Sequence, residues 1–216
     1  MIRTIIVFLL FSAHFAQAQQ IDQDLLRIKK RMDSVKQFSA SLILDLDVPF
    51  IKMPTKMAKI NYAIGQKMKF ASDDFVMLPK RGLDFSLSEI FKYPFITVDR
   101  GLEKRNGRII KVINIIPTTN QSDLALATIY MDTKAVRVVQ SEINTRKEGS
   151  YTLIMNYAQL KDILPAYVEA TFAIEKLKMP LNFMGKGTTI DRKKMRSMET
   201  KTGKIKMRIT NYNIRY

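Results

Sequence analysis

The sequence predicts an α+β domain built on a single, strongly curved antiparallel β-sheet of about ten strands, a half-barrel with an N-terminal helix and short helices lidding its concave face. Three observations predict this fold. Apolar residues recur at helical spacing near the start of the chain, they alternate with polar residues in most segments after residue 38, and short turn motifs join those segments. Strand twist curls a sheet this wide, and its apolar face needs a cover.

The first 18 residues have the pattern of a secretory signal peptide. Arg3 supplies a positive start, Ile5 to Phe11 is an unbroken apolar run, and Ala16-Gln17-Ala18 is a small-x-small cleavage motif. The apolar run is shorter than the ~20 residues that span a bilayer, which favours a cleaved leader over a membrane anchor. We therefore expect residues 1–18 to be removed and residues 19–216 to form one exported domain.

The residue inventory excludes much of enzyme chemistry. The chain of 216 residues has no cysteine, and its one histidine, His14, lies in the expected leader. The mature chain then lacks Ser-His-Asp and Cys-His catalysis and all sites that need Cys or His as metal ligands. We predict no catalytic residue, no metal site and no cofactor, and an enzyme is the least favoured class.

The mature chain is expected to open with one amphipathic helix. Its apolar positions recur at spacings of four and three residues: Ile21, Leu25, Ile28, Met32 and Val35. Asp22 is placed to cap the start. The opposite face is basic, with Arg27, Lys30, Arg31 and Lys36. Such a helix either packs on its own domain with a solvated basic face, which we favour, or lies on a membrane surface.

The remaining elements follow from period-two alternation. The expected strands are 41–47, 58–64, 68–70, 96–103, 108–116, 124–131, 135–144, 151–157, 168–176, 188–198 and 204–212. Their expected turns are Asn106-Gly107, Asp132-Thr133-Lys134, Lys147-Glu148-Gly149 and Thr202-Gly203. Short helices are expected at 87–92 and 159–164. A curled sheet covered by helices has a concave apolar interior, where ligand sites tend to lie.

The candidate ligand-binding residues are the large apolar side chains that strand parity places on that interior face. They are Leu42, Leu44, Leu46, Ile60, Tyr62, Phe70, Leu153, Met155, Phe172 and Ile174. On the other face of the first strand, Asp45 and Asp47 point the same way. They suit an acid–base pair or a calcium site, but a solvated strand face is the favoured interpretation.

A resemblance to a known family is carried by the block from Asp123 to Ala173. In it, Ala127-Thr128-Ile129-Tyr130-Met131-Asp132-Thr133-Lys134 leads through Val136-Arg137-Val138-Val139 and Lys147-Glu148-Gly149-Ser150 to Thr152-Leu153-Ile154. A second segment has Pro54-Thr55-Lys56-Met57 before Lys59-Ile60-Asn61-Tyr62. These patterns of strands and turns resemble the LolA family of periplasmic lipoprotein carriers and outer-membrane lipoprotein-sorting proteins.

The resemblance implies a periplasmic protein that shields lipid or lipoprotein acyl chains in an apolar cavity for transfer to the outer membrane. Inner- or outer-membrane proteins are the partners it implies. The alternative is a non-transporting envelope module of the same fold, which senses lipoproteins or scaffolds a complex. The sequence departs from the family at the arginine that ties the lid helices down. Its place falls on Lys59, on the strand face opposite Ile60 and Tyr62.

The charge is the feature that the fold does not explain. With 36 Lys+Arg against 20 Asp+Glu, the formal net charge is +16, and much of it lies near the C-terminus. We expect a basic stripe of Arg192, Lys193, Lys194, Lys204, Lys206 and Arg208 on two paired strands. Export and the absence of interleaved aromatic residues argue against nucleic acid. An anionic membrane surface or an acidic protein fits the stripe, and the alternative is an edge strand that uses lysines to block pairing.

Overall fold

The computed structural model describes residues 21–66, 68–72, 87–88, 90–147, 149–173, 187–197 and 202–216. The helices are α2 (Gln23–Asp33) and α3 (Arg192–Ser197). The strands are β1 (Gln37–Asp47), β2 (Ile51–Lys52), β3 (Lys56–Ala63), β4 (Lys69–Ala71), β5 (Phe95–Arg105), β6 (Arg108–Pro117), β7 (Leu124–Asp132), β8 (Arg137–Thr145), β9 (Gly149–Asn156), β10 (Tyr167–Ala173), β11 (Thr189–Ile190) and β12 (Thr202–Arg215). The expected signal peptide and Ile174 lie outside the described residues.

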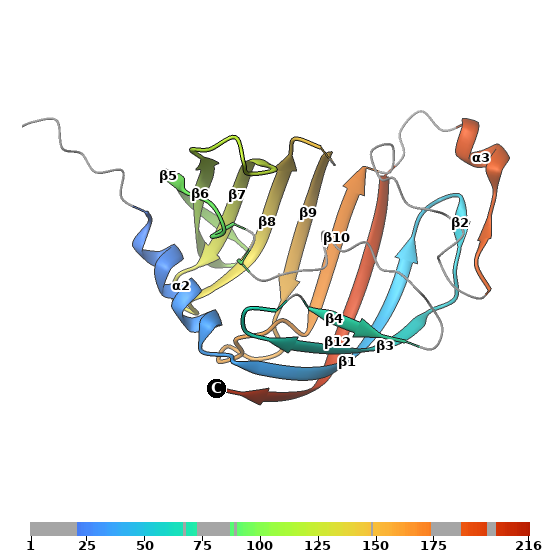
Figure 1. Ribbon diagram of the computed structural model, residues 1–216, viewed down its shortest axis with the longest axis horizontal. Helices are drawn as coiled ribbons and strands as arrows, with labels where there is room; N and C mark the ends of the chain where they lie inside the picture. The colour runs from blue at the N-terminus through green and yellow to red at the C-terminus, as the bar shows by residue number, and fades with distance from the viewer. Residues whose placement is uncertain are drawn as a thin grey trace, which may run out of the picture.

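Ten of the strands form one antiparallel sheet, and Figure 1 shows that this sheet is strongly curved. The strand order is β4-β3-β1-β12-β10-β9-β8-β7-β6-β5. Strands β5 to β10 form an antiparallel meander in which each strand pairs with the next. Strand β12 lies between β1 and β10 and pairs with both, so it joins the N-terminal strands to the meander. The remaining strands, β2 and β11, form a separate two-stranded ribbon. The α+β half-barrel predicted from the sequence is confirmed.

Helix α2 forms where the apolar spacing predicts it and begins at the predicted cap. The Asp22 carboxylate accepts hydrogen bonds from the backbone N–H groups of Asp24 and Leu25. Leu25 and Ile28 are fully buried, in the same apolar cluster as residues from β1, β6, β7, β9, β10 and β12. The helix therefore packs on its own domain, as favoured from the sequence.

Two short helices expected elsewhere are turns. Between Leu87 and Lys92 the described residues make one turn, with the Ile90 and Phe91 N–H groups donating to the Leu87 carbonyl. Residues 159–164 also form turns, and there the Asp162 carboxylate accepts from the Gln159 N–H. Pro94 and Pro165 follow these segments, and proline disfavours helical backbone in the residue before it.

The C-terminal prediction of a hairpin is wrong. The segment expected as a strand over 188–198 is the two-residue strand β11 followed by helix α3, and its partner is β2. Nor is Thr202-Gly203 a turn, because both residues belong to β12. Gly203 lies opposite Phe172, and a Cβ there would come within 2.7 Å of a Val48 methyl and 2.9 Å of the Phe172 ring. The glycine allows close packing rather than a reversal of the chain.

Candidate functional site: the face between helix α2 and the sheet

The residues predicted to line the concave face are brought together. Six of them are buried members of one apolar cluster: Leu42, Leu44, Ile60, Leu153, Met155 and Phe172. Leu46, Tyr62 and Phe70 are half-buried and pack against the same cluster. The nine predicted residues that the structure describes therefore lie on its buried face, as strand parity predicts, and their role in ligand binding stays a prediction. Strand parity also holds for Lys59, which is exposed while Ile60 is fully buried.

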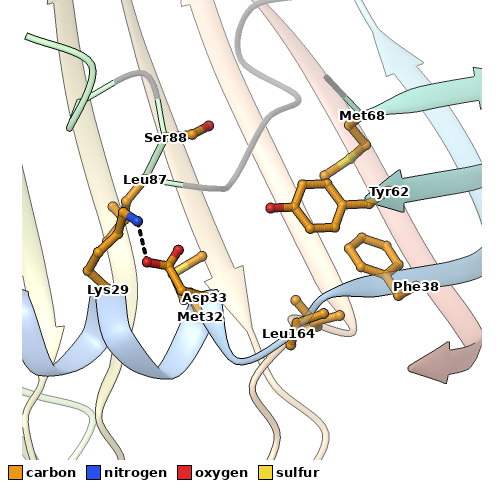
Figure 2. A pocket seen from close by; sticks show the side chains of 10 residues that line it. Lys29, Met32, Asp33, Phe38, Tyr62, Met68, Leu87, Ser88 and Leu164 are labelled. Atoms are coloured by element: carbon orange, nitrogen blue, oxygen red, sulfur yellow. Dashed lines mark hydrogen bonds and ion pairs between the residues drawn. The ribbon is translucent and has the colours of Figure 1, made fainter. Parts of the chain in front are cut away.

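A pocket lies where the C-terminal half of α2 meets the start of β1, the end of β3 and the turn at Leu87 (Figure 2). Its lining residues are Lys29, Met32, Asp33, Val35, Phe38, Tyr62, Met68, Leu87, Ser88 and Leu164. Of the predicted cavity residues, Tyr62 is the one that lines this pocket. The other predicted residues that the structure describes belong to or pack against the apolar cluster beside it.

The pocket has an apolar wall and a charged edge. On the sheet side, the Phe38 ring stacks on Tyr62 with their centroids 5.3 Å apart, and Tyr212 packs edge-on against Phe38 at 5.6 Å. On the helix side, Lys29 forms an ion pair with Asp33, whose side chain is 46% exposed. Figure 2 shows this pair on the helix, across the pocket from Tyr62 and Met68. The lining thus combines an apolar surface with a polar edge.

The pocket is small in this conformation. Its volume is about 30 Å³, whereas pockets for drug-sized ligands span roughly 300–1,000 Å³. Among the described residues, this pocket has room for water-sized molecules only. A larger apolar ligand would need the pocket to widen.

The C-terminal end of α2 is fastened by one arginine. The Arg31 guanidinium donates hydrogen bonds to the carbonyls of Ala135 and Val136 in the β7–β8 turn, the second at 3.1 Å. It also donates to the Lys161 carbonyl at 2.7 Å, in the turn before β10. Arg31 is thus the link between the helix and two loops at one end of the sheet. Neighbouring Arg137 donates to the Gln159 carbonyl at 3.1 Å and so braces the same loop.

The N-terminal end of α2 is fastened by charge. Lys111 on β6 lies 2.6 Å from an Asp22 carboxylate oxygen and 3.1 Å from one of Asp24. The Asp22 N–H also donates to the Thr97 hydroxyl of β5 at 2.9 Å. Burial works to lower the pKa of Lys111, but its hydrogen bonds to the two carboxylates outweigh this and raise it. The helix is therefore held at both ends.

The prediction that the basic stripe lies on two paired strands is wrong. Lys204, Lys206 and Arg208 lie on β12, which is not an edge strand, because β1 and β10 flank it. All three pair with carboxylates of those neighbours: Lys204 with Glu169 at 2.9 Å, Lys206 with Asp47 at 3.2 Å and Arg208 with Asp45 at 3.6 Å. Both strand aspartates of the sequence analysis thus have cationic partners. Helix α3, which is not a partner strand of β12, carries the other three: Arg192, Lys193 and Lys194.

Sequence reasoning missed the residues that fasten the helix and define the pocket edge. Arg31 was assigned to a solvated basic face, and Lys29 and Asp33 were not singled out. Their spacing of four residues was a readable signal for an ion pair on one helix face. The partners of Arg31 carry no such signal in the sequence, because they are backbone carbonyls. Those of Ala135 and Val136 lie more than 100 residues from Arg31 along the chain.

Among the described residues, no group of three or more His, Cys, Asp and Glu side chains is arranged to hold a metal ion. No helix in the described part of the chain has the length and apolar character needed to cross a membrane.

Comparison with solved structures places the fold. A DUF1329 family protein from Desulfovibrio piger superposes with a TM-score of 0.55 and 9% identity over 89% of this chain and 90% of its own. A LolA superfamily protein from Nitrosomonas europaea follows with a TM-score of 0.48 and 8% identity over 89% and 94%. An outer membrane lipoprotein-sorting protein domain from Vibrio parahaemolyticus gives 0.45 and 13% over 88% and 92%.

The superposition on the DUF1329 family protein shows a shared fold. The other two superpositions have TM-scores below 0.5 and carry no argument. Proteins of the family that the sequence resembles are nevertheless among the structural neighbours. No protein-family model matches the chain, and no curated protein matches its sequence.

Proposed function

We propose that this protein is a periplasmic carrier that binds the acyl chains of a lipid or lipoprotein between helix α2 and the concave face of the sheet, for transfer to the outer membrane. The observation that carries the proposal is the pocket beside Phe38, Tyr62 and Met68, with its apolar wall and its Lys29–Asp33 edge. The LolA-like pattern of residues 123–173 and the leader pattern of residues 1–18 support the cargo and the location.

In this proposal α2 is a lid that moves to admit the ligand. The pocket of about 30 Å³ is the closed state, and the apolar cluster below the helix supplies the surface that an acyl chain would cover. Opening the lid exposes apolar surface to water, which costs roughly 25 cal/mol of free energy per Å². A bound acyl chain offsets that cost because it covers the same surface again. Binding therefore depends on a ligand long enough to replace the contacts of the helix.

A photo-crosslinking experiment tests the site. A photoreactive amino acid replaces Met68, which lines the pocket, or Met57, which is 66% exposed on the outer face. Each variant of residues 19–216 is irradiated with a synthetic triacylated lipopeptide, and adducts are identified by mass. We expect adducts at position 68 and none at 57. Equal labelling at both positions, or none at 68, would overturn the proposed site.

The alternative is a module of the same fold that binds a protein partner without transporting lipid. The small pocket volume is the observation that favours it, because a face already filled by α2 needs no ligand to be stable. Native mass spectrometry of protein purified from an envelope fraction separates the two functions. A carrier retains the mass of an amphiphile, and a protein-binding module is free of one.

A further inference from the structure

Two groups of cations in the C-terminal part of the chain differ in their partners. On the outer face of the sheet, the β12 row of Lys204, Lys206 and Arg208 is matched one for one by carboxylates. On α3 four cations occur in six residues, and all four are exposed: Arg192, Lys193, Lys194 and Arg196, here called the α3 patch. None of the ion pairs found between described residues includes a member of this patch.

Helix α3 is held in place by a small apolar core of its own. Met195 packs against a buried cluster of Val48, Phe50 and Ile51, next to the β2–β11 ribbon. The Asp191 N–H donates to the Phe50 carbonyl at 2.9 Å, and the Asp191 carboxylate accepts from the Lys194 N–H at 3.0 Å. With Met195 turned inward, the rest of this short helix presents cations to solvent.

The position of α3 suits contact with an extended surface. Figure 1 shows α3 and the β2–β11 ribbon projecting at one end of the molecule, at the opposite end of the sheet from β5 and β6. Lys52, opposite Thr189 across the ribbon, is a further exposed cation beside it. A projecting element meets a flat surface without any rearrangement of the sheet or of α2.

We propose that the α3 patch docks the protein on an anionic lipid bilayer. The anchors of protein interfaces are most often Trp, Tyr and Arg in desolvated pockets. Residues 187–197 have no tryptophan or tyrosine, their two arginines are exposed, and none of the large exposed apolar side chains of the described residues lies among them. Lysine and arginine without apolar anchors are the pattern of electrostatic adsorption to anionic head groups. The β12 row does not take part, because its carboxylates already neutralise it.

The test compares two triple variants of equal net charge. Lys193→Gln/Lys194→Gln/Arg196→Gln removes three charges from the α3 patch, and Arg100→Gln/Lys104→Gln/Lys134→Gln removes three exposed charges from β5 and the β7–β8 turn. Binding is measured by cosedimentation with vesicles of phosphatidylglycerol and phosphatidylcholine in equal parts. Each lost contact is expected to weaken partitioning about fivefold, so the α3 variant loses on the order of 100-fold.

The matched variant is expected to lose only a few-fold, because at 0.1 M salt charges are screened beyond ~10 Å. Wild-type binding should fall as salt rises and vanish on vesicles of phosphatidylcholine alone. Equal losses in the two variants would overturn the proposal, since net charge would then suffice. Wild type that ignores the anionic vesicles at low salt but binds polyglutamate would also overturn it, in favour of an acidic protein partner. The outcome is independent of whether the pocket beside α2 binds lipid.

Discussion

Helices α2 and α3 both carry several cations, yet they are built into the molecule in different ways. Helix α2 buries Leu25 and Ile28 completely, and the Arg31 guanidinium donates hydrogen bonds to backbone carbonyls of two loops. Helix α3 has no buried residue and is anchored through half-buried Met195. The same residue types therefore fasten a structural element in one helix and remain free for a partner in the other.

Basic composition alone therefore does not identify a binding surface. A cation is available to a partner only if the fold leaves it without a carboxylate or carbonyl to satisfy it. By that criterion the helix that looks amphipathic and basic in the sequence is structural, and so is the β12 row. The predictions below test this contrast.

The largest expected effect is on the buried face of α2. Ile28→Asp places a charge where the wild-type side chain is fully buried, and we expect it to cost roughly 3–5 kcal/mol of unfolding free energy or to prevent folding. The matched change on α3, Met195→Asp, introduces the same charge at a half-buried site and should cost about 1 kcal/mol. Urea denaturation followed by circular dichroism measures both. Similar losses would mean that α3 is as integrated as α2.

Two arginines of α2 provide a second comparison. Arg31→Met removes charged hydrogen bonds to the carbonyls of Val136 and Lys161, and we expect a loss of about 2 kcal/mol. Arg27→Met on the same helix breaks a pair with Asp24 in which the arginine side chain is 62% exposed, and should cost about 0–0.5 kcal/mol.

Because Arg31 fastens the lid, its removal should also increase binding of a hydrophobic dye such as anilinonaphthalene sulfonate, and Arg27→Met should not. If Arg31→Met leaves both stability and dye binding at wild-type values, the helix is held by its apolar face alone.

A third prediction concerns pH and the β12 row. The hydrogen bond from Lys204 lowers the pKa of Glu169, outweighing burial, which acts in the opposite direction. A lowered folded-state pKa gives stability that is present above the ordinary glutamate pKa of about 4.3 and is lost as pH falls through the folded-state value. Lys204→Gln should therefore destabilise by at most about 1 kcal/mol at neutral pH.

The difference in unfolding free energy between wild type and Lys204→Gln should disappear at pH values below the folded-state pKa of Glu169. Urea midpoints at a series of pH values measure this difference. The α3 triple variant, which removes no ion pair found among the described residues, should run parallel to wild type over the same series. A gap that persists unchanged at acid pH would show that Lys204 stabilises by packing rather than by charge.

Much of the fold could be predicted because it depends on local patterns. The four-and-three spacing from Ile21 to Val35 and the alternation in β1, β3, β9 and β10 each specify one buried face, and the structure buries that face. The C-terminal region could not be predicted in the same way. Its turn residues at 202–203 signal a hairpin, but Gly203 is required by the approach of Phe172 and Val48, which are remote in sequence.

The candidate site was predicted in part. Strand parity identified the apolar face, including Tyr62, because alternation is a property of each strand alone. The pocket itself depends on where α2 and the turn at Leu87 cross that face, and no single segment encodes this crossing. The partners of the cations were equally hidden. Asp45 and Arg208 form an ion pair only because β12 returns beside β1.

The smallest expected effect is on the stability of the α3 variant. Each of Lys193, Lys194 and Arg196 is exposed, and exposed substitutions away from special features usually change the unfolding free energy by no more than ~0.5 kcal/mol. Removing like charges four residues apart or closer on one helix should offset part of any loss, because such neighbours repel each other. We therefore expect Lys193→Gln/Lys194→Gln/Arg196→Gln to unfold within ~0.5 kcal/mol of wild type, as measured by urea denaturation at neutral pH. A loss of several times that size would place the α3 cations among the structural ones, with those of α2 and β12.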